Sequence, residues 1–265
     1  MPGCGSSLKQ RRQAPLKTRE PRKALIIYYS QTGHTAGIAG HIDEVWKSSG
    51  LEVDLFNIRH VDPSDLGEYD LIAVGSPVYY LDVPKNVRQW LKSLQSIRGI
   101  PVASFVTYGG NGHNHHNTAC ELLELLSDKG GIPVGIAKFA HMNTFPPLWV
   151  VESKDRILKY RDLPNEETYN SARQYAADLM TWLKQGTSVE VEREFCLEGP
   201  AKYMALDWFT KIMITEHSID KLSCHTCGIC EATCPVGAIQ ISSQTIDTGR
   251  CIVCMGCINN CPNNA

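Results

Sequence analysis

Several common sequence features are missing from this chain, and each absence argues against a class of protein. No stretch of its 265 residues is long and apolar enough to span a membrane. No secretory signal is visible, so disulfide frameworks, which belong to oxidising compartments, are disfavoured. Neither G-x4-G-K-[ST] nor G-x-G-x-x-G occurs, which argues against nucleotide hydrolysis and a bound dinucleotide. G-x-S-x-G is missing too, so no hydrolytic serine is expected.

Acidic residues are scarce only at the start of the chain. The first 23 residues hold seven Lys and Arg against Glu20 alone, about +6, which leaves about −8 for the remainder. The acidic body argues against nucleic acid as a partner. Residues 1–22 also lack an apolar period, and we expect a disordered tail or a misassigned start. An acid-poor transit peptide is the alternative.

Cysteine, in contrast, is concentrated at the end of the chain. Eight of the eleven cysteines lie in the last 42 residues, in two runs of C-x2-C-x2-C-x3-C followed by proline. This doubled spacing is typical of two [4Fe–4S] clusters, in which three cysteines of a run bind one cluster and the fourth binds the other. Structural zinc is the weaker alternative, because its knuckles are separated by a long gap. The predicted ligand sets are Cys224, Cys227, Cys230 and Cys261 for one cluster, and Cys251, Cys254, Cys257 and Cys234 for the other.

The two cysteine runs belong to a longer internal repeat. With an offset of 27, Ile219-Asp220 aligns with Ile246-Asp247, and Ala238 aligns with Ala265. The first repeat continues through residues 239–241, whereas the second stops at Ala265. We therefore expect that a short closing strand is missing from the second repeat, through natural clipping or an incomplete sequence.

Between the arm and the repeat, apolar runs alternate with segments of helical periodicity. This pattern predicts five buried strands interleaved with helices, and hence an α/β fold with a parallel sheet. The expected strands are 23–29, 51–56, 70–75, 101–108 and 132–139. The expected helices are 34–49, 87–97, 118–127 and 166–184.

The loop after the first predicted strand, Ser30 to Thr35, reads S-Q-T-G-H-T and leads directly into a helix. Its backbone N–H groups, hydroxyls and the helix N-terminus converge on one small volume, which suits a terminal phosphate. Ligands of such sheets bind beyond the carboxyl ends of the strands. The sequence therefore predicts a phosphate monoester site at this edge.

The S-x-T-G-x-T loop resembles the FMN-phosphate loop of flavodoxins. Together with the cysteine runs, the chain is similar to flavodoxin–ferredoxin fusion proteins of anaerobic microbes, from Lys23 to Ala265. The resemblance implies a flavodoxin-like five-stranded parallel sheet and a small α+β two-[4Fe–4S] ferredoxin domain. The implied division is a basic arm at 1–22, an FMN-binding domain at 23–186, an apolar connector at 187–218 and a ferredoxin domain at 219–265.

The resemblance also implies FMN contacts from three loops. Two tyrosines in the second loop are candidates to flank the ring, although either could simply pack there. The third loop is rich in glycine, which lets backbone N–H groups approach the flavin, but an ordinary turn has the same composition. The implied residues are Ser30, Gln31, Thr32, Gly33, His34 and Thr35; Ser76, Pro77, Val78, Tyr79 and Tyr80; and Thr107, Tyr108, Gly109, Gly110, Asn111 and Gly112.

The remaining histidines and cysteines give weaker signals. His113, His115 and His116 follow the glycines, and we expect a solvated loop there rather than a metal site. Cys120 and Cys196 have no acid or base nearby in sequence, so we expect no catalytic role for them.

The connector contains apolar segments at 203–209 and 212–214, whereas a plain flexible tether would be polar. We expect a docked segment, with an exposed membrane- or partner-binding patch as the alternative.

These features predict a cytoplasmic electron-transfer protein with two [4Fe–4S] clusters and FMN, which exchanges electrons with redox partner proteins. No nucleic-acid partner is expected, and the sequence leaves a dimer open. Two other readings remain: a reductase in which flavin reduces a small molecule, with residues 142–149 as a pocket wall, and a module without flavin. No second nucleotide motif supports direct NAD(P)H oxidation.

Overall fold

The computed structural model describes residues 10–12, 16–64, 66–110, 114–151, 154–196, 206–214 and 217–265. The strands are β1 (Gln10–Arg12), β2 (Lys23–Tyr28), β3 (Glu52–Asn57), β4 (Leu71–Pro77), β5 (Pro101–Tyr108), β6 (Ile132–Ala140), β7 (Thr187–Val189), β8 (Ile239–Gln240) and β9 (Thr245–Ile246). The α-helices are α1 (His34–Ser48), α2 (Lys85–Ser93), α3 (His115–Ser127), α4 (Pro146–Val151), α5 (Lys154–Leu158), α6 (Glu166–Lys184), α7 (Leu206–Met213), α8 (Ile229–Thr233) and α9 (Gly256–Asn259), and η1 (Ile58–His60) is a 3₁₀ turn.

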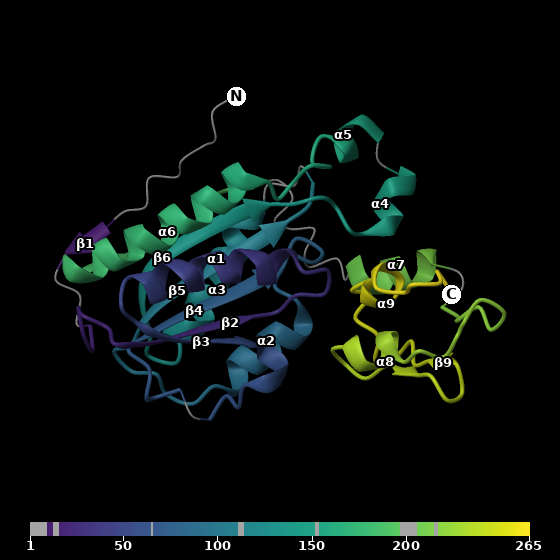
Figure 1. Cartoon of the computed structure of the whole chain (residues 1–265), viewed down its shortest axis with the longest axis horizontal. Coiled ribbons are helices and arrows are strands. Elements are labelled where there is room, and N and C mark those ends of the chain that lie inside the picture. Colours follow the sequence, from purple (N-terminus) through teal and green to yellow (C-terminus); the bar gives the residue numbers. More distant parts are fainter. Residues whose placement is uncertain are drawn as a thin grey trace.

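A five-stranded sheet forms the centre of the larger domain (Figure 1). Its order is β3-β2-β4-β5-β6, and all neighbouring strands are parallel. Every residue of β4 is buried, as expected for a strand covered on both faces. The predicted α/β fold with a parallel sheet is confirmed.

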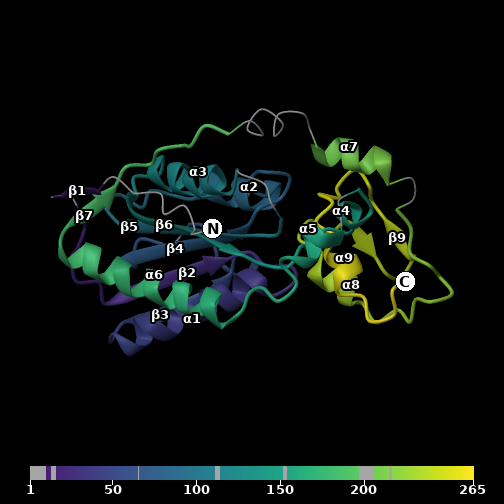
Figure 2. The same ribbon diagram turned by 90° about the horizontal axis from the view of Figure 1, so that it is seen from above.

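Helices cover both faces of the sheet (Figure 2). Successive side chains of a strand point to opposite faces, so β2 contributes to two separate cores. Leu25 and Ile27 join the core beneath α2 and α3, whereas Ala24 and Ile26 join the core beneath α1 and α6. The buried positions of α6 recur on one face of the helix, namely Ala172, Tyr175, Ala176, Leu179 and Leu183.

The helix predicted at 87–97 ends earlier, at Ser93. The following backbone pairs with a turn instead, since the Ile97 N–H donates to Lys129 O (2.9 Å) and the Gly99 N–H donates to Gly130 O (2.8 Å). Leu94 and Ile97 are still buried. Tertiary hydrogen bonds therefore replace the last turn of the predicted helix.

The expectation of a disordered arm is wrong for the described part of residues 1–22. Strand β1 pairs antiparallel with β7. Lys17 Nζ donates to the carbonyls of Gly67 (3.1 Å) and Tyr69 (2.9 Å) and lies 3.5 Å from an Asp70 carboxylate oxygen. A basic arm can order in this way because these acceptors lie together at one end of the sheet.

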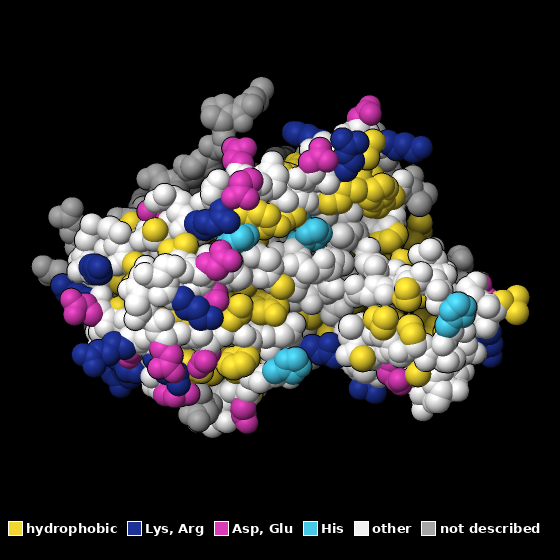
Figure 3. All heavy atoms as spheres, in the orientation of Figure 1, with side chains coloured by type: hydrophobic (Ala, Val, Ile, Leu, Met, Phe, Trp, Pro, Cys, Tyr) yellow, Lys and Arg dark blue, Asp and Glu magenta, His cyan; other side chains and the backbone are white. Residues whose placement is uncertain are grey.

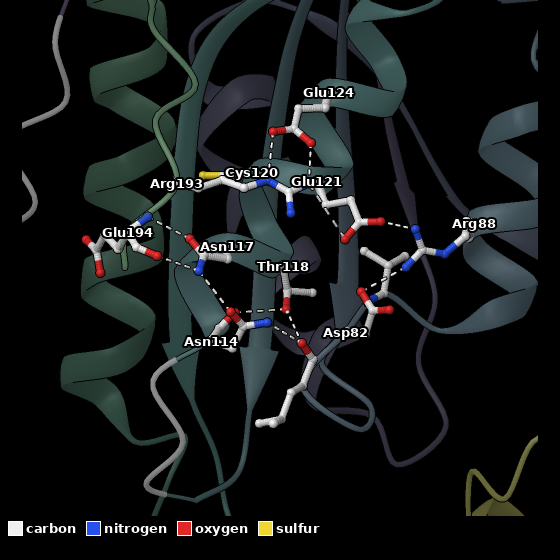
Figure 4. Close-up of polar contacts among 12 residues, drawn as sticks. Asp82, Arg88, Asn114, Asn117, Thr118, Cys120, Glu121, Glu124, Arg193 and Glu194 are labelled. Atoms are coloured by element: carbon white, nitrogen blue, oxygen red, sulfur yellow. Dashed lines mark hydrogen bonds and ion pairs between the residues drawn. The ribbon is translucent and has the colours of Figure 1, made fainter. Parts of the chain in front are cut away.

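The first part of the connector, which precedes the apolar segments, is docked on the larger domain. Asn117 Nδ2 donates to Glu194 O (2.8 Å), and Asn117 Oδ1 accepts from the Glu194 N–H (2.7 Å), as Figure 4 shows. Beside them, the Arg193 guanidinium pairs with Glu124 of α3. A clamp between α3 and residues 192–194 thus fixes the start of the connector.

The second part differs from the docked-segment prediction. On α7 the apolar side chains Trp208, Phe209, Ile212 and Met213 are all more than half exposed. Residues 197–205, which include the first three residues of the apolar segment at 203–209, lie outside the described part of the chain. For α7, the alternative prediction of an exposed patch describes the structure better.

Residues 217–265 form a small second domain, called here the cysteine-rich domain (Figures 1 and 2). It contains the short helices α8 and α9 and the antiparallel pair β8–β9. It lies beside the edge of the sheet to which the strand arrows point. Among the helices of the described residues, none has the length and hydropathy that crossing a membrane requires.

Candidate cofactor sites

The loops after β2, β4, β5 and β6 meet at the carboxyl edge of the sheet, where doubly wound folds bind ligands. The Thr35 and Thr107 hydroxyls, from the first and third predicted loops, lie 2.8 Å apart and are buried. Tyr29 and Tyr79, after β2 and β4, pack edge to face with ring centroids 6.1 Å apart. The three predicted loops therefore form one site.

The geometry of the Ser30–Thr35 loop fits a phosphate. Gly33 caps α1 with φ +90°, a left-handed conformation that favours glycine, and its N–H donates to Ser30 Oγ (3.1 Å). The 15-residue helix α1 has no acidic residue in its first turn, so its N-terminus favours an anion.

Gln31 in the same loop turns away from this anion site. Its Nε2 donates to Tyr29 Oη (3.0 Å) and to Thr233 O (3.3 Å) of the cysteine-rich domain. Its own carbonyl accepts from Asn260 Nδ2 (3.0 Å). The predicted phosphate loop is thus also part of the contact between domains.

The second loop is strained at Tyr80 (φ +53°) and Leu81 (φ +63°), since side chains other than glycine rarely adopt this region. Ser76, Pro77 and Val78 lead into it, with Ser76 and Pro77 buried at the end of β4. Tyr80 Oη donates to Val253 O (3.0 Å). Tyr79 packs on Tyr29, and Tyr80 bonds to Val253. The contact of either tyrosine with a flavin therefore stays a prediction.

The third loop packs against the loop that follows β6. A Cβ added at Gly109 would lie 2.6 Å from Asn143 Cα, so only glycine permits this approach. Asn143 Nδ2 donates to Gly109 O (3.0 Å), and Trp149 Nε1 donates to Asn143 O (3.2 Å). Gly110 follows with φ +115°, whereas Asn111 and Gly112 lie outside the described residues.

The expected solvated histidine loop is wrong for His115 and His116, which belong to α3 and are buried. His115 stacks on Tyr108 with centroids 3.7 Å apart, and His116 Nε2 lies 3.0 Å from Glu192 O. Packing partners from β5 and the connector draw these side chains inward. His113 lies outside the described residues.

Sequence reasoning missed a second histidine beside the phosphate loop. His34 and His141 stack with centroids 4.4 Å apart and an interplanar angle of 18°. Burial lowers the pKa of His34, and burial together with the His34 charge lowers the pKa of His141 to about 4. His141 directly follows β6. Because ligand-site residues of such folds follow the strand ends, this position could have indicated that His141 lies near the site.

All eight cysteines of the repeat line one cavity of about 140 Å³, far more than a single water molecule needs. Its other walls are mostly apolar side chains, including Ile239 and Val253. The ten cysteines that the structure describes are all free thiols. Within the same residues, no three His, Cys, Asp or Glu side chains are grouped as a site for a single metal ion.

The two cysteine runs have matching backbone geometry. In each run an N–H two residues after the first cysteine donates to its sulfur, from Thr226 to Cys224 (3.4 Å) and from Val253 to Cys251 (3.3 Å). Both donors have left-handed backbones, with φ +52° and φ +54°. For both this is strain, because threonine and valine are β-branched and rarely adopt such a conformation.

The fourth cysteines match as well. The Ala238 N–H donates to Cys234 Sγ (3.2 Å), and the Ala265 N–H donates to Cys261 Sγ (3.3 Å). Successive N–H groups directed at sulfur form the concave backbone sites that suit anionic iron–sulfur groups. The donor set and its backbone fit this kind of cofactor.

The thiols that act most strongly on Cys254 come from both runs. Burial raises the pKa of Cys254 to about 12, with further contributions from Cys257, Cys251 and Cys234. Cys230 of the first run likewise raises the pKa of Cys257, so these contributions do not divide the thiols into two sets, and the crossed ligand set stays a prediction. In the first run, burial raises the pKa of Cys230, and the neighbouring thiols Cys227 and Cys224 raise it further.

Family models match both parts of the chain. The "Flavodoxin domain" model matches residues 25–130, and the "4Fe-4S binding domain" model matches residues 217–240. The chain joins a flavodoxin domain to a 4Fe–4S domain. The matches agree with the parallel sheet and with the cysteine-lined cavity, which lie in those two parts.

Curated relatives match the flavodoxin domain. A flavodoxin of Clostridium saccharobutylicum is 37% identical over 70 residues, which are 26% of this chain and 44% of that protein. Probable flavodoxin 1 of Bacillus subtilis is 29% identical over 108 residues, which are 40% of this chain and 66% of that protein. The alignments thus span about half to two thirds of these relatives.

Solved structures match the same region. An archaeal flavodoxin has 19% identity and a TM-score of 0.45, covering 61% of this chain and 99% of that one. A flavodoxin from the Streptococcus pneumoniae strain TIGR4 has 19% identity and a TM-score of 0.47, covering 60% of this chain and 98% of that one.

The 4Fe–4S domain also contacts the loop after β6. Asn259 Nδ2 donates to Thr144 O (2.9 Å), and Tyr80 of the flavodoxin domain packs edge to face on Phe145 with centroids 5.5 Å apart. Figure 3 shows hydrophobic side chains gathered over the adjoining helix α4, and its Trp149 is 43% exposed. Residues 142–149, predicted as a pocket wall, therefore lie between the two domains.

Cys120, on α3, is the buried thiol among the described cysteines outside the repeat. Burial raises the pKa of Cys120 to about 12, although its sulfur lies 3.3 Å from His116 Nε2. A thiol held in its protonated form is a poor nucleophile. This agrees with the expectation of no catalytic role.

Proposed function

We propose that this chain is an electron-transfer protein that passes electrons between two [4Fe–4S] clusters and FMN. The flavodoxin domain and the 4Fe–4S domain support an electron-transfer role. The observation that carries the finer proposal is Gln31. This residue lies in the phosphate loop, yet its side chain and its carbonyl both bond to the 4Fe–4S domain.

The eight thiols would hold the clusters in the crossed arrangement. The matched N–H···S bonds of the two runs support two sites of the same kind rather than one. Hydrogen bonds to sulfur and the apolar walls of the cavity would tune the cluster potentials. The protein residues thereby provide the ligands, the backbone donors and the exclusion of water.

The three loops at the carboxyl edge would hold FMN. The Ser30–Thr35 loop would take the phosphate, while residues 76–80 and 107–112 would lie nearer the ring. When bound, FMN accepts electrons singly or in pairs, which lets one-electron clusters exchange with a two-electron carrier. External partners would be proteins that donate or accept single electrons.

Anaerobic purification of the full chain, followed by analysis of iron, acid-labile sulfide and released flavin, tests the proposal. The proposal expects about eight irons and about one FMN for each chain, since it assigns two four-iron clusters and one flavin to the chain. About four irons would contradict two clusters. A protein that binds no FMN even after incubation with it would contradict the flavin assignment.

A further inference from the structure

Several contacts between the domains lie beside the ligands of one predicted cluster, whereas Asn260, which bonds to Gln31, lies next to Cys261 of the other. Tyr80 bonds to the carbonyl of Val253, which lies between the ligands Cys251 and Cys254. A Cβ added at Gly256 would lie 2.1 Å from Gln31 Oε1, so the Gln31 side chain packs directly on the backbone between Cys254 and Cys257.

Arg59 fixes the crossing ligand of the same cluster. This residue lies in η1, just after β3, and its guanidinium donates to the carbonyls of Ala232 (2.7 Å), Thr233 (3.1 Å) and Cys234 (3.3 Å). These carbonyls are at the C-terminal end of α8, where a cation is favourable. A charged side chain of the flavodoxin domain thus holds the backbone of Cys234.

Tyr29 completes the contact from the end of β2. The ring is 1% exposed, and its hydroxyl accepts from Gln31 Nε2 (3.0 Å). Cys227, a ligand of the other predicted cluster, is exposed. One cluster site therefore faces the loops at the carboxyl edge, and the other has a ligand at the surface.

We infer that the cluster bound by Cys234, Cys251, Cys254 and Cys257 is the one that exchanges electrons with the flavin, and that Arg59 is a positioning residue for this transfer. The inference rests on the proposed function. The cluster loses one electron as the flavin gains one, and it is reduced again through the Cys227 cluster by an external one-electron donor. Partner proteins therefore exchange electrons at the Cys227 side.

The test compares Arg59→Met with Arg98→Met in the anaerobic full chain. Arg98 is exposed and precedes β5, at the opposite edge of the sheet, so it serves as the matched control. Arg59→Met removes three charge-assisted hydrogen bonds, and we expect electron transfer from clusters to flavin to slow by about tenfold or more. Iron and FMN contents are measured in every variant.

A second readout identifies the cluster beside the flavin. Microwave-power saturation of the one-electron-reduced flavin signal reports how strongly a reduced cluster nearby relaxes it. We expect Cys227→Ala to retain strong relaxation and Cys254→Ala to lose it. Each cysteine variant should keep the cluster that its substitution does not touch, and iron analysis checks this. If either variant has lost both clusters, the Arg59→Met protein provides the test instead. The inference then expects weaker relaxation of the flavin signal in Arg59→Met at unchanged iron and FMN contents.

The outcomes separate two failures. Strong relaxation in Cys254→Ala but not in Cys227→Ala, or an Arg59→Met protein with wild-type rate and relaxation, would overturn the inferred order. A wild-type protein without eight irons or without FMN would instead overturn the proposed function itself.

Discussion

His141 shows how much the surroundings of a single residue decide its chemistry. The imidazole is buried against His34 at the phosphate loop, and its pKa falls to about 4. As the pH falls, His141 of the unfolded chain takes up a proton near the ordinary histidine pKa of about 6.5. In the folded protein His141 takes up this proton only near pH 4. The resulting stabilisation is fully present above the unfolded pKa and is lost as the pH falls towards 4.

This linkage gives a measurable difference between variants. Between pH 7 and pH 5.5, wild type should lose about 1 kcal/mol more unfolding free energy than His141→Gln, which cannot titrate. Urea titrations followed by circular dichroism at both pH values measure this difference. His60→Gln, at an exposed position, should keep the wild-type slope. Equal slopes in wild type and His141→Gln would show that His141 is not held neutral.

Residue types with a strict covalent or backbone role could be assigned from the sequence, whereas packed side chains could not. The spacing of the cysteines indicates cofactor ligands, and the structure places all eight along one cavity, while the crossed ligation stays a prediction. His115 and His116 were misassigned, because their burial depends on Tyr108 and on residues of the connector.

At the scale of elements, the parallel sheet was predictable because its buried strands are continuous apolar runs. Strand β5 and helix α6 begin and end where the sequence predicts. Helix α2 and strand β1 differ from the prediction, since each depends on hydrogen bonds to distant parts of the chain. Local periodicity carries no information about such partners.

Two glycines provide a matched test of how the elements pack. Gly75 lies in β4, where an added Cβ would be 2.2 Å from the Phe105 ring, whereas Gly40 lies in α1 with no heavy atom within 4 Å of such a Cβ. We expect Gly75→Ala to lower the unfolding free energy by about 2 kcal/mol through overpacking. Gly40→Ala should raise it by about 1 kcal/mol, because alanine favours the helix. Urea titrations measure both, and an unaffected Gly75→Ala protein would contradict the packing described for β4.

At the scale of the whole molecule, the important feature is that the 4Fe–4S domain docks on the edge of the sheet that carries the phosphate loop (Figures 1 and 2). The sequence predicts two modules but not this arrangement. Gln31 was assigned to a cofactor, and nothing in its motif indicated Thr233 or Asn260 as partners. Arg59 follows β3 without any motif, so only its three carbonyl partners reveal its role.

The most direct test of the account is the kinetics of electron transfer after rapid photochemical reduction of the clusters in the FMN-loaded chain. Transfer within one docked molecule predicts that the flavin is reduced in a first-order phase whose rate constant does not change with protein concentration. A rate that rises in proportion to protein concentration, or clusters that stay reduced beside oxidised flavin, would contradict electron transfer within the chain.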